Sequence, residues 1–135
     1  MTMLRKPSFA IFVTCCFLIC VPLYFYFLNM NPYLTELGWD HAAGWMTLAQ
    51  VSDIVFLVLL GVMLKRLGYK LTIAIGILAW CLRYFLLAQS VGMAHALQTT
   101  MIFGAILLHG VCYDFLFIAG QLYVDAESNE RIRGA

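Results

Sequence analysis

The residues best suited to chemistry in this sequence are charged side chains inside strongly apolar stretches. His109 and Asp114 follow the uncharged run 101–108, and Asp53 and Arg83 interrupt two other apolar runs. A charged side chain at the centre of a bilayer costs at least about 2.5–3.5 kcal/mol. Such residues therefore predict a functional polar site, at which a carboxylate could bind and release a proton.

The acidic and basic members of this set are predicted to lie at one depth in the membrane. Each can be measured from a charged residue at the end of its own apolar run. Asp53 lies 12 residues before Lys65, and Arg83 lies 13 residues after Lys70. Asp114 lies 11 residues before Asp125. At 1.5 Å per residue each offset is about 16–20 Å, close to the bilayer midplane. The offsets predict one buried polar site; the alternative is an ion pair that only holds helices together.

Helical periodicity groups further polar and aromatic side chains with these charges. Steps of 100° per residue predict one face, spanning roughly 140°, for His109, Tyr113, Asp114, Phe117 and Gln121. Gln50 and Asp53 also share a face, at i,i+3 spacing. An aromatic and polar face predicts a ligand surface, and its alternative is a polar face in the core of a helix bundle.

The elements that carry these residues are predicted to be membrane-spanning helices. Of the 135 residues, 64% are hydrophobic and 11% are charged, whereas soluble domains average about 45–50% and 25%. The apolar segments long enough to cross a bilayer are about 8–28, 45–64, 71–88 and 99–122. The predicted class is an all-α, multi-pass membrane protein with four transmembrane helices.

The positions of the basic residues predict the orientation of the helices. Seven of the eight Lys and Arg residues fall at three places that four helices put on one side: Arg5, Lys6, Lys65, Arg66, Lys70, Arg131 and Arg133. That side is predicted to be cytoplasmic, with both termini there. The basic residues form no nucleic-acid patch, and the five cysteines indicate no metal site, cofactor or disulfide framework.

The turn between the second and third segments carries a recognisable motif. Gly61-x-x-x-Lys65-Arg66-x-Gly68-x-Lys70 resembles the cytoplasmic loop motif of the major facilitator superfamily, with Lys65 in place of its aspartate. In this motif Gly68 is also suited to a helix C-cap and a tight turn.

Several longer blocks resemble the nucleoside–proton symporter family. They begin at Asn31, Met46, Ala79, His109 and Arg131, and the resemblance covers residues 7–135. It implies helices seven to ten of a twelve-helix major facilitator fold. The positions that it assigns to the nucleoside site are Gln50, Asp53, His109, Tyr113 and Asp114. Aromatic residues near Tyr24 and Phe27 replace amides of the family, which leaves the choice between purine and pyrimidine nucleosides open.

The resemblance implies a proton-coupled nucleoside symporter, not an enzyme, in a bacterial inner membrane. Residues 1–135 would be part of its C-terminal six-helix half, with the N-terminal half and the last two helices missing, so this fragment is expected to be inactive alone. Its partners would be a nucleoside, a proton and the lipid bilayer. Asp114 is the first candidate for proton coupling, Asp53 is the second, and Arg83 is a supporting charge.

Two other functions compete with transport. Tyr113-Asp114 is similar to half of the motif of intramembrane aspartyl hydrolases, with Asp53 as the second acid, but the expected Gly-x-Gly-Asp is missing. A four-helix membrane scaffold would instead pair its polar residues internally and would bind no ligand.

Overall fold

The computed structural model describes residues 7–127, which form long helices joined by short turns. Within these residues the chain divides into two compact units, one with residues 7–45 and one with residues 46–127. In this described part of the chain, three helices are long and apolar enough to cross a membrane: Pro7–Glu36, Ala42–Ser90 and His95–Glu127. The all-helical membrane class is therefore confirmed. The basic residues predicted to mark the cytoplasmic side at the two ends, Arg5, Lys6, Arg131 and Arg133, lie outside the described residues.

Helix α1 (Pro7–Glu36) satisfies several polar side chains within its own length. Thr14 Oγ1 donates to the Ala10 carbonyl at 2.9 Å, and Asn29 Nδ2 donates to the Phe25 carbonyl at 2.8 Å. Such bonds let a polar residue lie in lipid without an external partner. The helix ends in a Schellman motif, because Gly38 has φ +78° and the following residue donates back to the Leu34 carbonyl.

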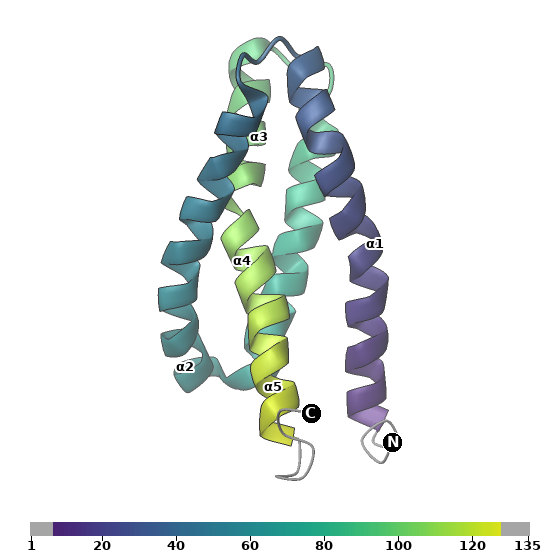
Figure 1. Ribbon diagram of the computed structural model, residues 1–135, viewed down its shortest axis with the longest axis vertical. Coiled ribbons are helices and arrows are strands. Elements are labelled where there is room, and N and C mark those ends of the chain that lie inside the picture. The colour runs from purple at the N-terminus through teal and green to yellow at the C-terminus, as the bar shows by residue number, and fades with distance from the viewer. Residues whose placement is uncertain (1–6, 128–135) are drawn as a thin grey trace. The chain divides into compact units, whose positions relative to one another are not determined.

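Helix α2 (Ala42–Ser90) is broken at Gly68, which has φ 72° and ψ 173°. Its 49 residues would extend about 74 Å as one straight helix, more than twice the roughly 30 Å of a bilayer core. Figure 1 shows the chain reversing direction at this point, so that α2 consists of two arms, residues 42–67 and 69–90. The turn predicted at Gly68 is confirmed, and the exposed motif residues Lys65, Arg66 and Lys70 flank it.

Replacing Gly68 by alanine is expected to destabilise the fold. The backbone angles of Gly68 fall in a region that is essentially restricted to glycine, where strain costs about 1–3 kcal/mol. No atom lies within 4 Å of the position of an added Cβ, so the effect would come from the backbone alone. The measurement is the thermal denaturation of the detergent-solubilised protein. Gly61→Ala, which is equally unobstructed but helical, should not lower the melting temperature, and equal melting of the two variants would contradict the expectation.

The remaining helix is continuous in direction but irregular in its hydrogen bonding. It consists of α3 (His95–Leu107), α4 (His109–Tyr113), a π-helical turn η2 (Asp114–Ile118) and α5 (Ala119–Glu127). At the end of η2 the Ala119 amide donates to the Asp114 carbonyl, five residues back. Such π-helical turns are rare and occur frequently at functional sites.

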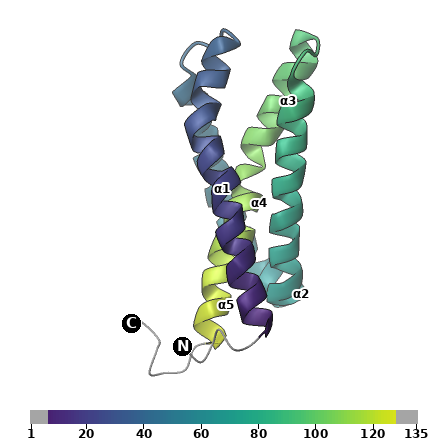
Figure 2. The same ribbon diagram turned by 90° about the vertical axis from the view of Figure 1, so that its right-hand side faces the viewer.

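This irregular helix runs antiparallel to the second arm of α2, as Figure 2 shows, and contacts it at Gly76 and Trp80. The approach is close at Gly76, where an added Cβ would lie 2.8 Å from the Leu116 amide nitrogen. Phe115 of η2 is buried with Leu60 of the first arm, and its ring meets Phe56 edge to face at 6.1 Å. The π-helical turn is therefore held between both arms of α2.

The outer faces of the same arms are apolar and exposed. Large hydrophobic side chains at 48–74% exposure include Ile54, Val58, Leu71, Leu78, Leu82 and Phe85. A soluble protein seldom exposes contiguous apolar surface of this kind, whereas lipid is its natural solvent. The charged residues discussed next lie between these lipid-facing surfaces.

Candidate functional site

The site forms where a hydroxyl group interrupts the helix 95–127. Ser52 Oγ, from the first arm of α2, donates to the Leu107 carbonyl and accepts from the Gly110 amide at 3.2 Å. An inserted side chain of this kind breaks the i→i−4 ladder of a helix, and the break falls between α3 and α4. An added Cβ at Gly110 would lie 2.6 Å from the Ser52 carbonyl oxygen, so the close approach requires glycine.

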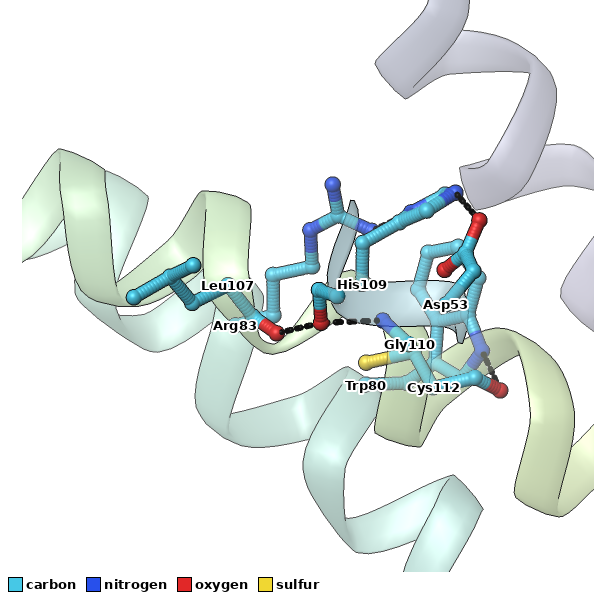
Figure 3. A network of polar contacts seen from close by, with 8 residues as sticks. Asp53, Trp80, Arg83, Leu107, His109, Gly110 and Cys112 are labelled. Atoms are coloured by element: carbon cyan, nitrogen blue, oxygen red, sulfur yellow. Dashed lines mark hydrogen bonds and ion pairs between the residues drawn. The ribbon is translucent and has the colours of Figure 1, made fainter. Parts of the chain in front are cut away.

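The break places His109 between a cation and a carboxylate, as Figure 3 shows. Arg83 from the second arm is fully buried, and its Nη1 lies 2.6 Å from His109 Nδ1. The other ring nitrogen, Nε2, lies 3.9 Å from Asp53 Oδ2. These three residues come from three helical segments, and we call them the charged cluster.

Trp80 supports the charged cluster from the second arm of α2. Its indole Nε1 donates to the Cys112 carbonyl at 3.1 Å, and the Arg83 guanidinium carbon lies 5.5 Å from the centre of its ring. Sequence reasoning gave no role to Trp80 or Ser52. For Trp80 the available signal was its indole N–H, which usually needs a partner when it is buried.

An aromatic row extends from the charged cluster along the same helix. The rings of His109 and Tyr113 are stacked with centroids 5.8 Å apart, and those of Tyr113 and Phe117 are 5.3 Å apart. The predicted common face of these three side chains is confirmed.

Asp114 is a buried acid next to the aromatic row, whereas Asp53 is only half-buried. It is 3% exposed, and its Oδ2 has no hydrogen-bond partner among residues 7–127. It interacts electrostatically with Asp53, which in turn interacts with Arg83. Gln50 and Gln121 are exposed. The π-helical turn adds a residue between Asp114 and Gln121, which shifts the phase of the later side chains away from the regular 100° steps that grouped the two residues.

The arrangement provides two carboxylates, one permanent cation and a histidine in a helical unit whose outer faces are apolar. Ionisable groups at such positions in membrane proteins mark paths for ions, protons or substrates. The fold and this site define the class: a helical membrane protein with an intramembrane polar site.

The chain belongs to the nucleoside H+ symporter family, whose model matches residues 1–135. It is 40% identical over 134 residues to "Putative nucleoside transporter YegT" of Escherichia coli (strain K12), covering 98% of this chain and 31% of that protein. It is 30% identical to "Nucleoside permease NupG" of the same organism, covering 71% and 22%. With "Xanthosine permease" it shares 24% identity, covering 67% and 21%.

The chain thus spans less than a third of the length of these relatives. No solved structure matches it. The resemblance seen in the sequence is confirmed, and the family consists of transporters rather than enzymes. This finding removes the hydrolase from the competing functions.

Proposed function

We propose that this chain is part of a proton-coupled nucleoside symporter that works by alternating access. The observation that carries the proposal is the charged cluster, Asp53–His109–Arg83, in which Arg83 and His109 are buried and Asp53 is half-buried, in a chain from this family. Buried charges of this kind are not needed for folding, because replacing buried ions by apolar residues is often neutral or stabilising. Their presence is therefore better explained by a ligand. A transporter needs these charges to recognise its substrate and to couple it to protons.

The proposed nucleoside site consists of Gln50, Asp53, His109, Tyr113 and Asp114. Ribose hydroxyls need both donors and acceptors, which a carboxylate, an imidazole and an amide supply together. The nucleobase needs an aromatic surface, and the row that includes Tyr113 offers one. Proton coupling is assigned to Asp114 first and to Asp53 second, with Arg83 as the supporting charge.

The proposed topology has four membrane crossings. The two arms of α2 would each cross once, since Gly68 reverses the chain between them, and α1 and the helix 95–127 would supply the other two. In a major facilitator fold these crossings would belong to the C-terminal half, with the turn at Gly68 and both termini in the cytoplasm of a bacterial cell. Substrate sites in such transporters lie near the bilayer midplane, at interrupted helices.

The proposal is tested by nucleoside binding to a purified transporter assembled with this chain. Uridine or adenosine at 100 times its dissociation constant should stabilise the folded protein by about 2.7 kcal/mol, measured as a rise in melting temperature. Ribose alone and the free nucleobases are the control ligands. The same rise is expected in Asp40→Asn, which changes an exposed acid outside the site. A folded protein that no nucleoside stabilises would favour the scaffold instead.

A further inference from the structure

Arg83 occupies an unusual position for a cation. It is fully buried, and its guanidinium lies against the imidazole ring of His109. The 2.6 Å distance between Nη1 and Nδ1 is that of a short hydrogen bond. Trp80 lies below the guanidinium at 5.5 Å and is itself hydrogen-bonded to the backbone of α4, which keeps this geometry in place.

The chemistry of the two groups determines which of them donates. An arginine side chain has five N–H donors and no acceptor, and it is not deprotonated in proteins. Nδ1 of His109 must therefore accept, through a lone pair, and cannot carry a proton. A neutral imidazole has one protonated nitrogen, so the remaining proton is on Nε2, which faces Asp53 Oδ2 at 3.9 Å.

We propose that Arg83 is a positioning residue that holds His109 as the neutral tautomer protonated on Nε2, with that N–H directed toward Asp53. This inference rests on the proposed function and assigns within it a task to a residue that would not itself contact the nucleoside. It also gives His109 a fixed role: it offers one donor at Nε2, and it does not act as a second cation.

The charges of the site then follow. Arg83 contributes one positive charge, ionised Asp53 contributes one negative charge, and His109 contributes none. Asp114 is the other acid of the site; it is buried, and it interacts electrostatically with Asp53. Protonation of Asp114 therefore changes the site from a net charge of −1 to neutral. If His109 were an imidazolium, the site would already be neutral before Asp114 took up a proton. Because Arg83 keeps His109 neutral, proton exchange is left to the carboxylates.

The test is the ¹⁵N magnetic resonance spectrum of histidine-labelled protein in lipid nanodiscs at neutral pH. Comparison with His109→Gln assigns the His109 signals among those of the three histidines. The expected spectrum has an unprotonated Nδ1 and a protonated Nε2. Arg83→Met, which removes every donor, should introduce the Nδ1-protonated form, and Arg83→Lys, which keeps donors and charge, should restore the original pattern. Arg66→Met, at an exposed arginine of the turn, is the matched control and should change nothing.

A proton on Nδ1 in the unmodified protein would overturn the proposal, as would an unchanged tautomer in folded Arg83→Met. If Arg83→Met does not fold, the spectra of the unmodified protein and of Arg83→Lys still decide the question. The spectrum requires no transport. Nucleoside stabilisation with the wrong tautomer would therefore reject the role of Arg83 alone, and the right tautomer without nucleoside stabilisation would reject the proposed function alone.

Discussion

Gly110→Ala is expected to prevent the helix 95–127 from packing against the first arm of α2. The added Cβ would lie 2.6 and 2.7 Å from the Ser52 carbonyl oxygen and carbon, distances that real Cβ atoms essentially never show. Because these are backbone atoms, a change of side-chain rotamer cannot relieve the overlap. The cost should reach or exceed the upper end of the ~1–3 kcal/mol typical of overpacked cores. The measurement is the melting temperature and the yield of monodisperse protein in detergent.

The matched control is Gly104→Ala, six residues earlier in the same helix. There an added Cβ would meet only the Leu86 Cδ1 atom at 3.5 Å, an ordinary contact. Its melting temperature should equal or exceed that of the unmodified protein, because alanine favours helix over glycine by about 1 kcal/mol. If Gly110→Ala were as stable as Gly104→Ala, the close approach of Ser52 to α4 would be incorrect.

Asp114→Asn is expected to abolish proton-driven nucleoside uptake by a transporter assembled with this chain. The substitution keeps the size and the hydrogen-bonding capacity of a protonated carboxyl group but cannot release a proton. Asp114 is buried and interacts with the other acid of the site, so its charge affects the whole site. Uptake driven by an imposed pH gradient in proteoliposomes should fall to background, whereas exchange of nucleoside across the membrane without a gradient should persist.

The exchange measurement separates loss of coupling from loss of folding or binding. Asp40→Asn, in the turn before α2 and exposed, should leave both activities intact. Undiminished gradient-driven uptake by Asp114→Asn would show that another group carries the proton, and Asp53 would then be the next candidate. Loss of both activities in Asp114→Asn would contradict the expectation that the amide mimics the protonated acid.

Sequence reasoning could bring Asp53 and Arg83 into one site because depth in a membrane helix is nearly a linear function of residue number. The rise of 1.5 Å per residue is constant, and the apolar runs supplied the ends from which to count. Their separate contacts with His109 in the structure agree with that arithmetic. The aromatic row was predictable for a similar reason, since Tyr113 and Phe117 follow His109 at intervals of four residues.

The break at Leu108 and the π-helical turn could not be derived in this way. Both depend on contacts far apart in sequence: Ser52 reaches the break across 55 residues or more, and Gly76 lies against Leu116. The spacing of apolar residues does not reveal that a hydroxyl group inserts into a helix. It also does not reveal where a glycine allows another backbone segment to come close. The grouping of Gln121 with Asp114 depended on regular helical steps, which the extra residue of the π-helical turn interrupts.

The π-helical turn also bears on how this helix can vary in length. Asp114–Ile118 holds one residue more than an α-helical path between the same ends would need. A deletion of one residue within the turn can be absorbed by a return to α-helical geometry, because the later residues keep their orientation. A deletion within α5 instead rotates every later side chain by about 100°. Changes of chain length are therefore tolerated best where the helix is least regular, beside the buried carboxylate.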